Sequence, residues 1–162
     1  MGLLSSSENL PKTGQPAPGF HLRDQDGKFH DLNDYKGTPI VLYFYPKDDT
    51  PGCTIEARGF RDAAKQYEDA GLKVLGVSLD KVASHKKWAE KMCLTFTLLA
   101  DEEGDVAERY GVRRGLGPLT VAARVTFLID REGKVAKIWK SVDPRVHADD
   151  VLASARSLGL AV

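Results

Sequence analysis

The pattern of apolar and polar positions changes along the chain, and each change marks a different element. Residues 39–45 form a continuous apolar run, rich in β-branched and aromatic side chains, that is too short for a buried helix. This run predicts a central strand covered on both faces. From Ala57 to Ala70 the apolar residues recur at helical spacing and Gly71 supplies the stop, so a helix follows the strand. Residues 73–78 predict the next buried strand.

The remaining elements complete an alternation of strands and helices. The turn Asp26-Gly27 between residues 20–22 and 28–30 predicts an N-terminal hairpin. We further expect helices at 82–92, 104–110 and 147–158, and strands at 96–99, 121–129 and 134–139. This order predicts an α/β fold with a mixed central sheet flanked by helices. We interpret residues 1–162 as one domain with a flexible tail at 1–13.

Composition limits the possible partners. Apolar residues make up 42% and charged residues 28% of the chain, and 23 basic residues balance 23 acidic ones. Without a net basic field, binding of nucleic acid or of an anionic membrane is not expected. No apolar run approaches the roughly 18 residues of a membrane span, and residues 1–7 lack the features of a secretory signal. We therefore expect a cytoplasmic protein whose partner is a small neutral molecule or another protein.

The two cysteines, Cys53 and Cys93, fit none of the common multi-cysteine patterns. They form neither a disulfide scaffold nor a CxxC redox motif, and they lack the spacing of a zinc site. The four histidines are scattered without metal-ligand spacing. We therefore expect no metal and no cofactor, and any chemistry of Cys53 has to follow from its neighbours.

Residues 45–54 lie directly after the predicted central strand and before a helix, where ligands bind in open α/β sheets. Cys53 falls in the first helical turn, whose free amides and positive dipole end favour a thiolate. Thr50 is placed for its hydroxyl to touch the sulfur or a substrate oxygen, and Pro46 stiffens the loop. From spacing alone, an ordinary loop with a capping threonine and a half-buried cysteine is an equal alternative.

The segment Pro46-x-x-x-Thr50-x-x-Cys53 resembles the peroxiredoxin active-site motif, and residues 45–57 resemble the peroxiredoxin Q group, also called bacterioferritin comigratory proteins. Four other segments also match this group in the same order: 14–20, 24–27, 96–101 and 125–130. The resemblance implies a thioredoxin-like fold with an added N-terminal hairpin. It also implies a monomeric thiol peroxidase that reduces hydrogen peroxide and organic hydroperoxides without metal, haem or flavin.

The resemblance also assigns roles to particular residues. The Cys53 thiolate would attack the peroxide to give a sulfenic acid, which thioredoxin or another thiol then reduces. An arginine reaches the thiolate from a late strand in this family, and the matching residue here is Arg124. Its planar cation suits both a thiolate and a peroxide. Glu56, on the same helical face as Cys53, either hydrogen bonds to Arg124 or serves only as a first-turn acid.

The chain departs from its family at the resolving cysteine, because the two usual positions hold Arg58 and Ala89. Cys93 either resolves Cys53 after local unfolding, or is a buried cysteine that fills the gap between helix and sheet. Two rival functions also remain open. A thiol-disulfide oxidoreductase on the same fold is weakened by the missing CxxC. A redox sensor or holdase would use oxidation of Cys53 only as a signal.

Overall fold

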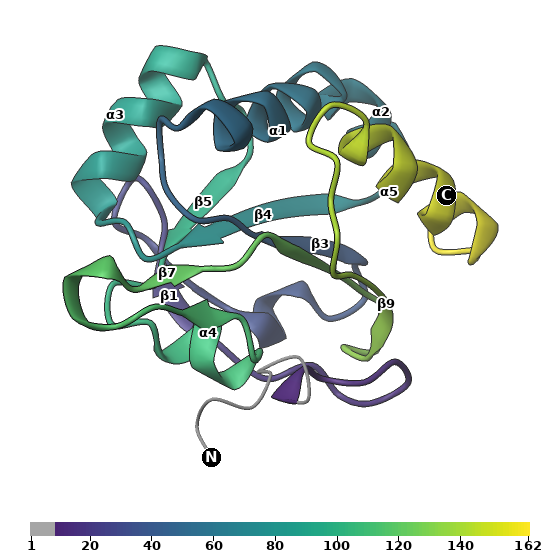
Figure 1. Ribbon diagram of the computed structural model, residues 1–162. Coiled ribbons are helices and arrows are strands. Elements are labelled where there is room, and N and C mark those ends of the chain that lie inside the picture. The colour runs from purple at the N-terminus through teal and green to yellow at the C-terminus, as the bar shows by residue number, and fades with distance from the viewer. Residues whose placement is uncertain (1–8) are drawn as a thin grey trace.

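Seven strands form one mixed sheet within residues 9–162, the part of the chain that the computed structural model describes (Figure 1). The strand order across this sheet is β2-β1-β5-β4-β3-β8-β9. The strands are β1 (His21–Arg23), β2 (Phe29–Asp31), β3 (Ile40–Phe44), β4 (Lys73–Ser78), β5 (Thr97–Ala100), β8 (Val125–Ile129) and β9 (Val135–Trp139). A separate two-stranded ladder joins β6 (Arg113–Arg114) to β7 (Val121–Ala122).

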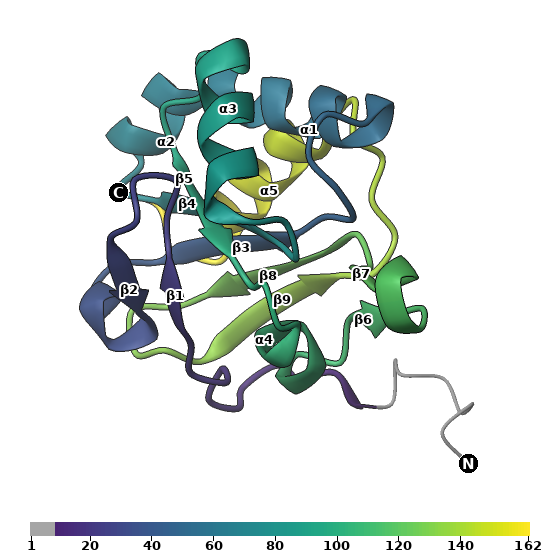
Figure 2. The same ribbon diagram turned by 90° about the vertical axis from the view of Figure 1, so that its left-hand side faces the viewer.

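Helices cover both faces of the sheet (Figures 1 and 2). The helices α1 (Pro51–Asp62), α2 (Ala64–Asp69), α3 (Val82–Met92) and α5 (His147–Ser157) lie on one face. The short helix α4 (Asp105–Arg109) lies on the other face, and 3₁₀ turns occur at Leu32–Tyr35 and Gly117–Leu119. None of the helices in residues 9–162 is long and apolar enough to cross a membrane.

The central strand β3 divides the core into two parts. All five of its side chains are buried, which confirms the prediction from the continuous apolar run. Because successive side chains point to opposite faces, Val41 and Tyr43 pack with α1, α3 and α5, whereas Leu42 and Phe44 pack with α4. Each face of β3 is therefore the floor of one hydrophobic core.

Strand pairing fixes which segments meet at the carboxyl end of β3. β3 pairs in parallel with β4, and β4 pairs in parallel with β5. On its other side β3 pairs antiparallel with β8, in a register that sets Phe44 opposite Val125. The residue before Val125 therefore lies beside the start of the loop that leads from β3 into α1.

Two expected elements are divided in the structure. The strand expected at 121–129 separates into β7 and β8, and the Ala123 amide between them donates to the Val112 carbonyl. β3 ends at Phe44 and is followed closely by Pro46, which has no amide to extend the ladder, so β7 pairs with β6 instead. The helix expected through residue 70 is divided at Ala63, where the backbone has φ −92° and ψ 4°.

The flexible tail expected at residues 1–13 reaches too far along the chain, because part of it packs against the fold. Residues 1–8 lie outside the described part of the chain. Leu10 is only 8% exposed and belongs to the core on the α4 side of the sheet. The chain therefore packs against the fold several residues before the boundary that its composition suggested.

Candidate active site

Cys53 lies in the first turn of α1, as the sequence predicts. Thr50 has the extended backbone of an N-cap residue, Pro51 is the first helical residue and Cys53 the third. The side chain belongs to the core between α1 and the sheet, and Cys53 is only 1% exposed. At this position the sulfur lies where free amides and the positive end of the helix dipole favour an anion.

Arg124 reaches this sulfur from the start of β8. The β3–β8 register places it beside the loop that leads into α1. Its Nη2 donates to Cys53 Sγ at 3.4 Å, and its side chain is 21% exposed. The expectation that a distant strand supplies a guanidinium to the sulfur is confirmed.

The same guanidinium is shared with Glu56, because Arg124 Nη1 donates to Glu56 Oε1 at 2.7 Å. Of the two interpretations of Glu56, the hydrogen bond to Arg124 is therefore the one observed. Burial raises the pKa of Glu56 to about 7, although Arg124 favours the ionised form. Burial also works against the charge of Arg124, but Glu56 and Cys53 outweigh it and raise the pKa of that guanidinium.

The second carboxyl oxygen of Glu56 lies near His147 of α5. Oε2 is buried without a hydrogen-bond partner among the described residues and lies 3.9 Å from His147 Nε2. The same ring nitrogen is 2.7 Å from Thr126 Oγ1. Burial and the nearby Arg124 lower the pKa of His147 to about 4, so this imidazole is neutral near pH 7. The sequence contains no local signal for His147, which meets Glu56 only through the packing of α5 on α1.

Thr50 and Pro46 flank the site without touching the sulfur. The Thr50 hydroxyl donates to the Lys47 carbonyl at 2.7 Å, which leaves the lone pairs of Oγ1 available to a ligand. Among the described residues, Arg124 is the hydrogen-bond partner of Cys53 Sγ, so the expected contact between Thr50 and the sulfur is not observed. Pro46 is half-buried at the start of the loop. Contact of Thr50 with a substrate oxygen stays a prediction.

Gly52 is a part of the site that the sequence reasoning missed. A Cβ atom at this position would lie 2.9 Å from Arg124 Nη2 and 3.6 Å from Arg124 Cζ. Real Cβ atoms do not approach other heavy atoms so closely, so any side chain here would displace the guanidinium. The absence of a side chain at Gly52 therefore allows Arg124 to cross the start of α1 and reach Cys53.

Cys93 is exposed, so the interpretation as a buried packing cysteine is wrong. It follows the last turn of α3 and has a left-handed backbone, with φ 54° and ψ 44°. This conformation is uncommon for a residue other than glycine. The preceding residues tie the end of α3 to the site, because Lys91 pairs with Asp49 at 3.0 Å and Arg61 of α1 donates to the Met92 carbonyl at 2.9 Å.

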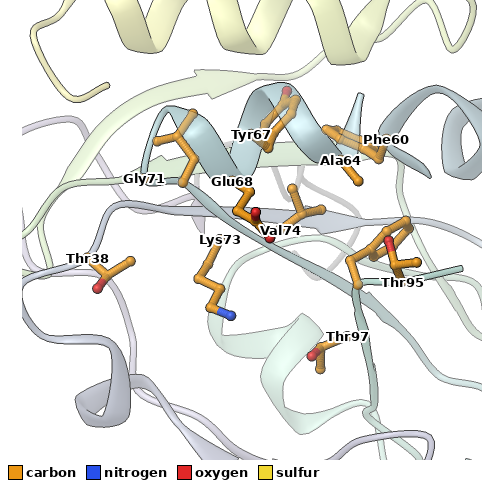
Figure 3. Close-up of a pocket in the computed structure, with 12 residues that line it drawn as sticks. Thr38, Phe60, Ala64, Tyr67, Glu68, Gly71, Lys73, Val74, Thr95 and Thr97 are labelled. Atoms are coloured by element: carbon orange, nitrogen blue, oxygen red, sulfur yellow. The ribbon is translucent and has the colours of Figure 1, made fainter. Parts of the chain in front are cut away.

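A cavity of about 350 Å³ lies near α2, β4 and β5 (Figure 3). Phe60, Tyr67 and Val74 give it an apolar wall, and Glu68 and Lys73 supply charge. Its lining includes none of Thr50, Glu56 and Arg124. The chemistry of the thiol therefore has to be explained from the loop between β3 and α1.

Comparison with known proteins finds related sequences over most of the chain. The AhpC/TSA family matches residues 13–138. A peroxiredoxin designated bcp from Coxiella burnetii is 45% identical over 145 residues, which cover 87% of this chain and 96% of that protein. The chloroplastic peroxiredoxin Q of Populus jackii is 43% identical over 146 residues, which cover 90% of this chain and 68% of that protein.

Solved structures show the same fold. Peroxidoxin BcpB from Mycobacterium tuberculosis has a TM-score of 0.86 at 39% identity, covering 91% of this chain and 98% of that one. A bacterioferritin comigratory protein from Xanthomonas campestris, described for its alkyl peroxide reduction activity, has a TM-score of 0.83 at 31% identity, covering 91% and 99%. These neighbours confirm the expected thioredoxin-like fold with its mixed sheet.

Gly52→Ala is expected to slow the reaction of Cys53 with iodoacetamide at pH 7 by about tenfold, the effect of losing one hydrogen bond to a charged group. The new methyl group displaces Arg124 from the sulfur. Gly59→Ala in the same helix is the control, since its Cβ would meet only Ala148 Cβ at an ordinary 3.6 Å. Alkylation of the Gly52→Ala variant at the wild-type rate would show that the glycine is not needed.

Glu56→Gln is expected to remove a pH dependence of stability. Glu56 has a raised pKa in the folded protein, so its contribution to stability is present below pH 4.5 and is lost as pH rises to about 7. At about 1.4 kcal/mol per pH unit, the unfolding free energy of wild type relative to Glu56→Gln falls by up to about 3 kcal/mol across this interval. Urea unfolding of both proteins at several pH values measures this difference, and a constant difference contradicts the shift.

Proposed function

The chain belongs to the AhpC/TSA family and is a thiol peroxidase, and from this premise we propose that Cys53 is its peroxide-reducing thiolate. The observation that carries the proposal is the 3.4 Å hydrogen bond from Arg124 Nη2 to Cys53 Sγ. Only a thiolate attacks peroxide effectively, and a guanidinium beside the sulfur favours that form. The position of Cys53 at the start of α1 acts in the same direction.

The reaction begins when the thiolate attacks the nearer oxygen of a hydroperoxide in line with the O–O bond. An S–O bond forms and the O–O bond breaks, so Cys53 becomes a sulfenic acid. The leaving oxygen takes up a proton from solvent water and departs as water or an alcohol. Arg124 stabilises the charge that moves along the O–O bond, since its donors already lie at the reacting sulfur.

Thr50 and Pro46 complete the proposed site. The Thr50 hydroxyl proton is occupied by the Lys47 carbonyl, so Oγ1 is free to accept the hydroperoxide O–H. That bond orients the peroxide with its nearer oxygen toward Cys53. Pro46 shields the sulfenic acid from water and from a second peroxide. Glu56 acts through Arg124, which it holds with a 2.7 Å hydrogen bond.

We propose that hydrogen peroxide and organic hydroperoxides are both substrates, in keeping with the alkyl peroxide reduction described for the Xanthomonas relative. Thioredoxin or another thiol recycles the sulfenic acid. The protein acts as a monomer in the cytoplasm. Two free cysteines fit this location, because the cytoplasm keeps thiols reduced. No metal or cofactor enters the proposed cycle.

Cys93 is the proposed resolving thiol. It is exposed, whereas a buried structural cysteine would be inert. Its left-handed backbone is costly for a residue other than glycine, and unwinding the end of α3 would release that cost. Since Cys53 is only 1% exposed, the first turn of α1 has to open as well before the two sulfurs can meet.

Cys53→Ser is expected to lose essentially all turnover of hydrogen peroxide and of cumene hydroperoxide with dithiothreitol as reductant. Cys93→Ser is the matched control and keeps this activity, because a small thiol can reduce the sulfenic acid directly. A substantial peroxidase rate in Cys53→Ser would exclude the proposed nucleophile. Insulin reduction without peroxide consumption would favour the oxidoreductase alternative, and a substoichiometric peroxide reaction would favour the sensor or holdase.

One equivalent of hydrogen peroxide is expected to link Cys53 to Cys93. Non-reducing peptide mass analysis should then find the two cysteine peptides joined, with the loss of two hydrogens, and thioredoxin-dependent turnover should fall in Cys93→Ser. A peroxide-treated protein oxidised at Cys53 alone, with unchanged thioredoxin-dependent turnover in Cys93→Ser, would contradict this assignment and leave an external thiol as the direct reductant.

A further inference from the structure

His85, in the first turns of α3, has hydrogen-bond acceptors at both ring nitrogens. Nε2 lies 2.9 Å from the Leu99 carbonyl oxygen, and Nδ1 lies 2.8 Å from Asp48 Oδ2. The imidazole is completely buried, and the Asp48 side chain is 3% exposed. A carbonyl oxygen can only accept, so Nε2 carries a hydrogen and Nδ1 shares a proton with Asp48. The pair is therefore joined by a strong buried hydrogen bond.

Asp48 is the anchored residue of the loop between β3 and α1. Besides His85, its carboxylate accepts from the Tyr45 hydroxyl at 2.7 Å and from Ser84 Oγ at 2.8 Å. Its amide donates to Asp80 Oδ2 at 2.8 Å, and the same oxygen accepts from Ser78 Oγ at 2.6 Å. Buried polar networks whose members are all satisfied hold their backbone rigidly.

The grouping of Asp48, Asp80 and His85 would also suit a cation, since their ligand atoms lie within 4.8 Å of one another. Two observations favour a structural network instead. Each of these three side chains already has protein hydrogen-bond partners, and a cation at His85 would have to displace the proton shared with Asp48. The cluster is thus a connection between α3 and the loop.

This connection reaches the proposed reacting groups within a few residues. Asp49 follows with a left-handed backbone at φ 58°, and Thr50 caps α1 while its hydroxyl bonds back to Lys47. Figures 1 and 2 both show α3 beside the segment that leads into α1. The orientation of Thr50 and the start of the Cys53 helix therefore depend on where Asp48 is held.

We propose that His85 is a positioning residue for the peroxidase reaction: through Asp48 it holds the loop in the shape in which Thr50 flanks Cys53 and Arg124 contacts its sulfur. The inference rests on the proposed role of Cys53. Loss of the connection lets the loop move, so attack on peroxide slows, whereas reduction of oxidised Cys53, which needs the loop to open, does not slow. If His85 only stabilised the fold, its loss would not slow the oxidation of Cys53 while leaving the reduction of oxidised Cys53 unaffected.

The test compares His85→Leu, Asp48→Ala and the double variant with wild type in two separate half-reactions. The first is single-turnover oxidation of Cys53 by hydrogen peroxide without reductant, and the second is reduction of the oxidised enzyme by dithiothreitol. His85→Leu is expected to slow oxidation about 10- to 100-fold, as small displacements of reacting groups do. Reduction should be as fast as in wild type or faster, and hydrogen exchange at residues 48–54 should increase.

His30→Leu is the matched control, because His30 also pairs with a carboxylate, Asp24 Oδ2 at 2.7 Å, but in the N-terminal hairpin. It should leave the oxidation rate unchanged. If His85→Leu folds poorly because Asp48 is left unpaired, the double variant removes both groups and recovers the fold while oxidation stays slow. Oxidation within twofold of wild type in a folded His85 variant overturns the inference. Absence of Cys53-dependent turnover in wild type would instead overturn the proposed function.

Discussion

The guanidinium of Arg124 is shared between two acids, the thiol of Cys53 at 3.4 Å and the carboxyl group of Glu56 at 2.7 Å. The rest of the site depends on this sharing. Arg124 can reach both groups because the β3–β8 register places it beside the loop before α1, and because Gly52 leaves room for it. A change in strand register of one residue would turn the side chain to the opposite face of the sheet. The position of the cation is therefore a property of the whole sheet.

Because the surroundings of Arg124 are buried, the net charge of the site depends strongly on the ionisation of the neighbouring Glu56 and His147. A fully ionised Glu56 competes with the sulfur of Cys53 for the same cation, yet burial raises the pKa of Glu56 to about 7, so a neutral carboxyl group is accessible near neutrality. His147 adds no second cation, since burial lowers its pKa to about 4. Buried ion pairs are costly to form, but loss of one partner is costlier because it leaves a charge uncompensated. Glu56 therefore holds Arg124 in place without permanently competing for all of its charge.

The sequence alone predicted much of the fold, because burial patterns of single strands and helices are local. β4 and α3 have the predicted limits, and β3 is shorter than predicted by one residue at each end. Cys53 could be placed at a helix start for the same reason. Arg124 could be assigned only through the family resemblance, since its contact with Cys53 spans 71 positions and depends on strand register. Gly52, His147 and the Asp48–His85 pair were missed because their roles exist only after distant elements have packed.

The loop between β3 and α1 is held from two directions, and the proposed cycle needs both anchors to be strong but reversible. Arg124 holds the sulfur from the β8 side, and His85 holds Asp48 from the α3 side. The proposed cycle requires a small peroxide to reach a sulfur that is 1% exposed, and a protein thiol or Cys93 needs the first turn of α1 to open as well. Oxidation favours opening in a direct way, because a sulfenic acid is neutral and no longer attracts Arg124 as a thiolate does. The anchor at Asp48 is untouched by that change. In the proposed cycle, the Asp48–His85 pair limits how much of the loop moves once the interaction with Arg124 has weakened.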